Sequence, residues 1–333
     1  IMSIIATEFE TLGINGSDAS TFMAAIPYQF YSILALFLIP IVAFGRHDFG
    51  FMAKAEEQAR LGLPQNISDD EAILVSDDKK VSPWNMILPL VILLGTILVM
   101  FVSWGFPFQN IPGSKIRIAL TSGYLLASIV CMIMITAQKL MSFKETFDVF
   151  IGGIQKMGSV LVVVVLAWGV GSVCKDLGTS QFIVDSTLGL ITPHVVPALL
   201  FLVGVIISFA TGTSWGAMAI LLPIGINMAV GFGVSIPMTI GAVLSGCLFG
   251  DHCSPISDTT VMSAMAAGCD LLEHTRTQLP YAGIAALASF VAYLILGFTN
   301  ANIWIMLVVA LALLIVFYLL SCRLWGVKAA ESK

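Results

Sequence analysis

Long apolar runs separated by short polar segments dominate the pattern of this chain. A helix needs about 20 apolar residues to cross the hydrocarbon core of a bilayer, so runs that are uncharged, or charged only at their edges, predict membrane-spanning helices. The predicted helices cover residues 22–44, 84–103, 117–137, 154–174, 279–298 and 302–322. Pro27 lies inside the first run, and a membrane helix tolerates it where neighbouring helices satisfy the backbone. The pattern therefore predicts an all-α polytopic membrane protein.

Two stretches between these runs need separate treatment. Residues 45–83 are the one long polar segment, and they predict a solvated loop whose first part forms a short amphipathic helix. Residues 186–269 form a long apolar block in which only Asp251 and Asp258 carry formal charge. We therefore divide the chain into five parts. These are an N-terminal segment with the first span (1–44), the loop (45–83), further spans (84–174), the interrupted apolar region (175–278), and the C-terminal spans with a short tail (279–333).

The apolar block interrupts its own helices at two places. The run of small polar residues from Thr211 to Ser214 stands between two apolar arms that are each too short to span alone, which favours a re-entrant hairpin over residues 195–230. Close helix packing through small residues is the alternative for this run. Pro255 then divides a second element, a discontinuous helix over residues 236–269, whose second half has Ser257 or Asp258 as its N-cap.

Composition and charge narrow the class further. The chain is 58% hydrophobic and 11% charged, with a net charge of -5, and it has no basic patch that would neutralise phosphates, so nucleic acid is excluded as a partner. The six cysteines form no CxxC pair and are interpreted as packing residues. With the 45–83 loop in the cytoplasm, twelve of the 15 lysines and arginines fall on the cytoplasmic side together with the C-terminus.

The two acidic residues are the strongest candidates for chemistry. A carboxylate in mid-membrane costs about 2.5–3.5 kcal/mol on insertion scales, so Asp251 and Asp258 require partners, water or protonation. Asp258 can act as a helix cap. Asp251 ends a half-helix, where the helix dipole disfavours a carboxylate, and a bound cation or a proton would offset this cost. His252 is either a proton relay or a satisfied hydrogen-bond donor.

With these residues in view, the chain resembles the NhaC-type sodium/proton antiporters of the ion-transporter superfamily. The resemblance rests on "FATGTSWGAMAILLPI" (209–224) and "FGDHCSPISDTTVMSAMAAGCDLLEHTRTQLPYA" (249–282), and more loosely on "IPYQFYSILALFLI" followed by "RHDFGFMAKAEEQA". It implies a secondary-transporter fold with two inverted repeats, each contributing a re-entrant hairpin and a discontinuous helix. One repeat is complete here. We therefore expect the other to lie upstream of Ile1, and the chain to match roughly the C-terminal two thirds of such a protein.

The resemblance also implies an activity, namely exchange of sodium or lithium for protons across the cytoplasmic membrane, with no enzymatic reaction and no resident cofactor. Asp251 and Asp258 are then the carboxylates that bind transported sodium and couple it to protons. Hydroxyl groups complete the expected ion-binding set. They come from Ser254, Ser257, Thr259 and Thr260 at the break, and from Thr211, Thr213 and Ser214 at the hairpin. The expected partners are sodium or lithium, protons, the lipid bilayer and a second copy of the chain in a homodimer.

Two alternatives stay open at this point. A transporter of the same fold can exchange or co-transport an organic anion such as a carboxylate, although no lysine or arginine lies between Ser186 and Cys269 to attract one. An intramembrane aspartyl protease also uses two aspartates. In that class, however, the catalytic pair comes from separate spans, whereas Asp251 and Asp258 share one break.

Overall fold

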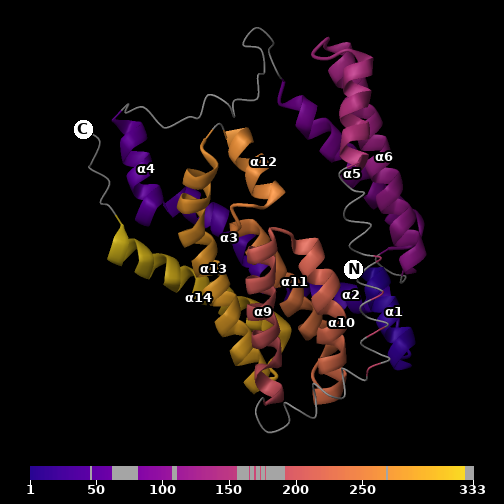
Figure 1. The fold of residues 1–333 in the computed structure, drawn as a ribbon, viewed down its shortest axis with the longest axis vertical. Helices are drawn as coiled ribbons and strands as arrows, with labels where there is room; N and C mark the ends of the chain where they lie inside the picture. The colour runs from indigo at the N-terminus through magenta and orange to yellow at the C-terminus, as the bar shows by residue number, and fades with distance from the viewer. Residues whose placement is uncertain are drawn as a thin grey trace.

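The computed structural model describes residues 1–45, 47–61, 82–106, 111–155, 192–267 and 269–326, together with the single positions 165, 169, 173 and 177. The helices are α1 (Met2–Leu12), α2 (Asp18–Ala25), η1 (Ile26–Tyr28), α3 (Phe30–Gly45), α4 (Gly50–Arg60), α5 (Trp84–Ser103), α6 (Gly113–Ala137), η2 (Pro193–Val195), α9 (Val196–Thr211), α10 (Ser214–Phe232), α11 (Ile236–Cys253), α12 (Asp258–Ala267), α13 (Leu271–Thr299) and α14 (Ile303–Trp325) (Figure 1). Residues 143–155 are helical as well. Within these ranges six helices are long and apolar enough to cross a membrane, and they include α9 with η2 and α10. The prediction that the two arms of the 195–230 hairpin are each too short to span is therefore wrong, because both arms extend to 19 helical residues. The predicted all-α polytopic membrane fold is confirmed.

The predicted spans agree with the observed helices to different degrees. The predictions for 84–103, 117–137 and 302–322 fall on α5, α6 and α14. The 279–298 helix begins earlier than predicted, at Leu271, because the Asp270 carboxylate caps it by accepting hydrogen bonds from the Leu272 and Glu273 N–H groups, both at 3.0 Å. Most of the predicted 154–174 helix lies outside the described residues.

The prediction of one continuous helix over 22–44 is wrong. α2 and α3 are separate helices that meet at an angle of 46° across η1. Pro27 removes a backbone N–H from this turn, and Gln29 leaves the helical region with ψ of 64°. The Tyr28 carbonyl accepts a hydrogen bond from the Tyr293 hydroxyl at 2.6 Å. The bend is therefore held by a side chain of α13, a partner that local sequence cannot reveal.

α11 is the central helix of the bundle. Thirteen of its 18 residues are buried, and it contributes to hydrophobic clusters on two sides, one shared with α3, α13 and α14 and the other with α1 and α10. Its closest neighbour is α9, which it meets through Gly246 and Gly250, four residues apart. A Cβ atom at Gly246 would lie 2.1 Å from the Phe201 carbonyl oxygen. This small-residue contact lets the two backbones touch.

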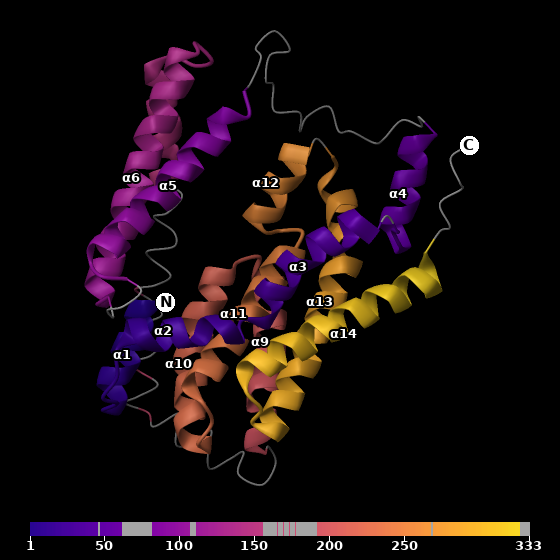
Figure 2. The same ribbon diagram turned by 180° about the vertical axis from the view of Figure 1, so that it is seen from behind.

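The remaining helices surround this centre. Seen from both sides, α5 and α6 form a hairpin at one side of the molecule, α13 and α14 lie at the other, and α9, α10 and α11 lie between them (Figure 1, Figure 2). Arg117 of α6 joins the hairpin to α2 through an ion pair of 3.5 Å with Asp18. The short helix α4, expected at the start of the 45–83 loop, is tied to the bundle through the Tyr281 hydroxyl, which donates to the Asp48 carboxylate. The rest of that loop, residues 62–81, lies outside the described residues.

Candidate ion site at the break of α11

The helix break comprises residues 254–257, between α11 and α12. Pro255 cannot donate a backbone hydrogen bond, and it disfavours helical geometry in the residue before it. Accordingly Ser254 is extended, with ψ of 128°, and α11 ends at Cys253. A new helix begins at Asp258. The interruption predicted at Pro255 is present, and the chain does not run through residues 249–260 as one continuous helix.

The hairpin tip comprises residues 211–214, between α9 and α10. Gly212 ends α9 in the left-handed region with φ of 66°, and Thr213 caps α10 by accepting a hydrogen bond from the Gly216 N–H at 3.4 Å. A Cβ atom at Gly212 would lie 2.9 Å from the Ile256 carbonyl oxygen, so the tip packs directly against the break. Two interruptions 40 residues apart in the chain thus meet in space.

Asp251 lies where the tip and the break meet. Only 7% of its surface is exposed. Its Oδ2 atom accepts a hydrogen bond from the Ser214 hydroxyl at 2.9 Å, and its Oδ1 atom accepts one from the Ser257 hydroxyl at 2.7 Å. The Ser257 proton is used in that bond, so in the 2.8 Å contact between Ser257 and Thr259 the threonine is the donor. One carboxylate therefore receives one hydroxyl from each interruption and a third through a relay.

This environment leaves the negative charge of Asp251 incompletely balanced. The residue lies in the last turn of α11, where the helix dipole disfavours a carboxylate. Within the described part of the chain the one ion pair is Arg117–Asp18, which does not involve Asp251. Hydroxyl dipoles alone offset part of the cost of a buried carboxylate, and a small cation or a proton would supply the rest.

Among the described residues, the other predicted site residues form no hydrogen bond to the Asp251 carboxylate. Some are exposed, and others join neighbouring helices. Asp258 is exposed and is the first residue of α12, where the helix dipole favours its charge. Thr211 is also exposed, and its hydroxyl donates to the Ile207 carbonyl of its own helix at 2.8 Å. Ser254 donates to the Phe209 carbonyl at 2.8 Å and joins the break to α9. Thr260 donates to the His252 carbonyl at 3.3 Å and joins α12 to the end of α11.

His252 points to a contact that the sequence did not indicate. Its Nδ1 atom lies 2.6 Å from the Tyr31 hydroxyl of α3, and its backbone carbonyl accepts a hydrogen bond from the Gln278 amide of α13 at 2.8 Å. Tyr31 lies within the loosely matching "YQFY" stretch, but 221 residues separate it from His252. No spacing rule connects residues so far apart, so only the folded chain brings Tyr31 and Gln278 to the break.

Comparison with known proteins identifies the family to which this arrangement belongs. The model of the Na+/H+ antiporter family matches residues 1–298. This chain belongs to the Na+/H+ antiporter family. The resemblance to NhaC-type antiporters is thereby confirmed, and members of the family are transporters. The hypothesis of an aspartyl protease gains no support, because Asp251 and Asp258 lie on either side of one break and differ in burial.

Individual relatives show the range of proteins to which this chain is similar. An uncharacterized protein of Haemophilus influenzae is 27% identical over 95% of this chain and 61% of its own length. The malate-2H(+)/Na(+)-lactate antiporter of Bacillus subtilis is 28% identical over 63% of this chain and 43% of its own length. The Na(+)/H(+) antiporter NhaC of Alkalihalophilus pseudofirmus is 27% identical over 38% of this chain and 27% of its own length. The chain thus spans less than two thirds of these relatives. No solved structure matches it significantly.

Proposed function

We propose that the full-length protein is a secondary active transporter that exchanges sodium or lithium for protons across the cytoplasmic membrane. The observation that carries the proposal is the Asp251 carboxylate, buried within an apolar bundle and held between hydroxyls of the hairpin tip and the helix break. Family membership and the NhaC relative support the same activity. The 45–83 loop and the C-terminus are proposed to face the cytoplasm, because lysines and arginines are concentrated there.

The mechanism follows from the chemistry of one shared carboxylate. Sodium is a hard cation that prefers oxygen ligands, and Asp251, Ser214 and Ser257 present a carboxylate and two hydroxyl oxygens at one point. A proton on Asp251 removes the charge that attracts sodium, so the two ions exclude each other. A site that holds one ion or the other, and that faces the two sides of the membrane alternately, exchanges them.

The remaining hydroxyls and Asp258 receive supporting roles in this proposal. Thr259 holds the Ser257 hydroxyl in place, and Thr213, Ser254 and Thr260 fix the backbones that meet at the site. Asp258 stabilises the start of α12 and forms the outer, exposed part of the ion path. The hairpin of α9 and α10 is proposed to be re-entrant, so that its tip lies at mid-membrane depth.

Transport by the reconstituted full-length protein tests the proposal. Liposomes that contain a trapped pH dye receive an inward gradient of sodium, lithium, potassium or a carboxylate such as malate or lactate. We expect sodium and lithium to enter in exchange for protons and so to alkalinise the interior, and potassium to have no effect. If no cation changed the internal pH, the proposed exchange would be refuted. Light scattering from the detergent-solubilised protein before reconstitution tests whether it is a homodimer.

Replacing Ser257 by alanine is expected to raise the sodium concentration needed for half-maximal exchange roughly tenfold, because a hydrogen bond to a charged group contributes about 1.5–3 kcal/mol. Half-saturation in the liposome assay measures this effect. Thr211→Val is the matched control, since the Thr211 hydroxyl bonds within its own helix and is exposed. Equal half-saturation in S257A and T211V would remove Ser257 from the ion site.

His252 is proposed to carry protons between the aqueous side and the site. Tyr31 occupies its Nδ1 atom, which leaves Nε2 to exchange protons. His252→Gln is therefore expected to slow exchange without changing half-saturation by sodium, and Tyr31→Phe is expected to slow it less, by releasing the ring. Rates measured at saturating sodium separate an effect on the speed of exchange from an effect on sodium binding. An H252Q variant with a wild-type rate would exclude the relay.

A second candidate is transport of an organic anion coupled to sodium or protons. Two helix N-termini meet at the site, those of α10 at Ser214 and α12 at Asp258, and such termini attract carboxylates. The malate and lactate antiporter among the relatives favours the same reading. In the liposome assay, a pH response that requires malate or lactate together with sodium would establish this candidate in place of simple cation exchange.

A further inference from the structure

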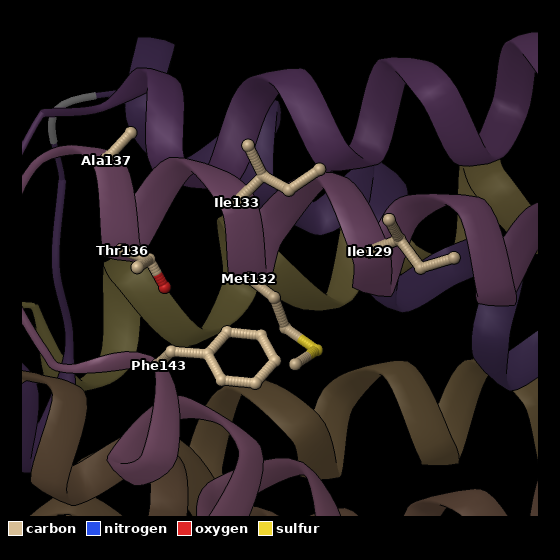
Figure 3. A pocket seen from close by; sticks show the side chains of 6 residues that line it. All are labelled: Ile129, Met132, Ile133, Thr136, Ala137 and Phe143. Atoms are coloured by element: carbon tan, nitrogen blue, oxygen red, sulfur yellow. The ribbon is translucent and has the colours of Figure 1, made fainter.

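A groove on the outer surface of α6 stands apart from the ion site. It has a volume of about 470 Å³ and lies between the last turns of α6 and the helix that follows. Its walls, shown in Figure 3, are the side chains of Ile129, Met132, Ile133, Thr136, Ala137 and Phe143. Five of these six residues are hydrophobic, and Ile133 and Phe143 are exposed, so the groove opens towards the lipid.

Thr136 supplies the only hydroxyl among the side chains of this lining. Its Oγ1 atom is buried and has no hydrogen-bond partner in the part of the chain that the structure describes. Several helical threonines and serines among the described residues donate to the carbonyl four residues earlier, as Ser128 does to Tyr124 on the same helix at 2.8 Å. Figure 3 shows the Thr136 oxygen turned towards the space that Met132 and Phe143 border. A buried hydroxyl without a partner is costly, so the geometry favours a ligand with an oxygen that accepts a hydrogen bond from Thr136.

The residues at the Thr136 end of the groove are of the kinds found at a membrane interface. α6 ends at Ala137, and the Gln138 amide forms a reciprocal pair with Asn85 at the start of α5, with distances of 3.0 and 2.6 Å. Trp84, 61% exposed beside this pair, is a residue type that favours the membrane interface. At 1.5 Å per residue, Ile129 lies about 10 Å deeper than Thr136, within the hydrocarbon layer.

Two lysines lie next to residues of the lining in the sequence. Lys139 lies two residues beyond the end of α6, and Lys144 follows Phe143 in the next helix. Of the acidic residues nearby, Glu145 is engaged at the start of its own helix, where its carboxylate accepts hydrogen bonds from the Ser142 N–H and hydroxyl at 2.7 and 2.8 Å. Asp148 lies one turn further along that helix. Basic side chains at this depth attract anionic lipid headgroups.

We propose that this groove binds one anionic glycerophospholipid from the leaflet on the side of the 45–83 loop. One acyl chain lies along Ile129, Met132 and Ile133, and the Thr136 hydroxyl donates to an ester carbonyl of the glycerol backbone. The phosphate lies between Lys139 and Lys144. Apolar walls, a buried donor and basic side chains follow one another along the groove in the order in which hydrocarbon, ester and phosphate follow one another in the lipid. The site is separate from the transport site and does not depend on it.

The test uses the purified full-length protein, mixed with equal amounts of phosphatidylglycerol and phosphatidylcholine that carry a photoreactive group on one acyl chain. We expect crosslinks from phosphatidylglycerol to concentrate on residues 129–143. Ile133→Trp fills the groove and should abolish these crosslinks. Thr136→Val should reduce them roughly threefold to tenfold, the effect of one hydrogen bond. Lys139→Gln with Lys144→Gln should remove the preference for phosphatidylglycerol over phosphatidylcholine.

Ile118→Trp is the matched control, because Ile118 is 53% exposed on the same helix but lies near its other end. It should leave the crosslinks unchanged. Crosslinks spread evenly along α5 and α6 in the wild-type protein would overturn the proposal without any variant. Crosslinks that survive I133W, or that T136V and the lysine double variant leave unaltered, would overturn it as well.

Discussion

Replacing Asp251 by asparagine is expected to reduce sodium-driven proton movement to the level of protein-free liposomes. Asparagine keeps the size of the side chain. Its amide can accept a hydrogen bond from one of the Ser214 and Ser257 hydroxyls and donate one to the other, whereas both hydroxyls donate to the carboxylate in the native site. It can neither release a proton near neutral pH nor provide the negative charge that attracts sodium. The variant therefore preserves packing and removes the exchange itself.

Asp258→Asn is the matched control for this variant. Asp258 is a carboxylate of the same break, but it is exposed at the first position of α12, so its loss should cost about 0.3–1 kcal/mol of helix stabilisation and slow exchange only moderately. If D258N abolished transport while D251N retained it, the assignment of the two carboxylates would be reversed. If both variants exchanged at the wild-type rate, the site would lie elsewhere.

Replacing Gly246 by alanine is expected to have the largest effect on stability. The added methyl carbon would lie 2.1 Å from the Phe201 carbonyl oxygen, a distance that no contact of this kind tolerates, so α9 and α11 would have to separate. Because α9 carries the hairpin tip and α11 carries Asp251, this separation would also pull the site apart. We expect G246A to lose most of its folded, monodisperse protein in size-exclusion chromatography and to denature at a lower temperature.

Gly283→Ala is the control for the chemical change itself. Gly283 lies within α13, and a Cβ atom there would have no neighbour within 4 Å. In an open helical position alanine is favoured over glycine by about 0.4–1 kcal/mol, so G283A should be as stable as the wild type or slightly more so. If G246A and G283A denatured at the same temperature, the packing of α9 against α11 would not depend on backbone contact at Gly246.

The sequence predicted those parts of the site that local chemistry determines. Pro255 lacks a backbone N–H and disfavours helical geometry in the residue before it. Gly212 ends α9 through its left-handed backbone, and the Thr213 hydroxyl caps α10. Asp251 stood out because no local role explained a carboxylate at the end of a buried half-helix. These features depend on neighbours within a few residues, so they can be predicted from the sequence alone.

The parts that sequence did not predict depend on distant partners. Nine residues were candidate ligands, but only the packing of the tip against the break selects Ser214 and Ser257 as the hydroxyls that reach Asp251. The bend between α2 and α3 depends on Tyr293, and the orientation of His252 depends on Tyr31. The contacts of Tyr293 and Tyr31 each join residues more than 200 positions apart, and no local periodicity encodes them.

Sodium binding to the purified full-length protein, measured with radiolabelled sodium across a range of pH, tests the central claim most directly. If proton and sodium compete for Asp251, the affinity for sodium should fall as the pH falls, by up to about tenfold per pH unit, since the ligand must lose its proton to bind the ion. D251N should bind no sodium at any pH. Sodium binding that is independent of pH, or that persists in D251N, would contradict the account.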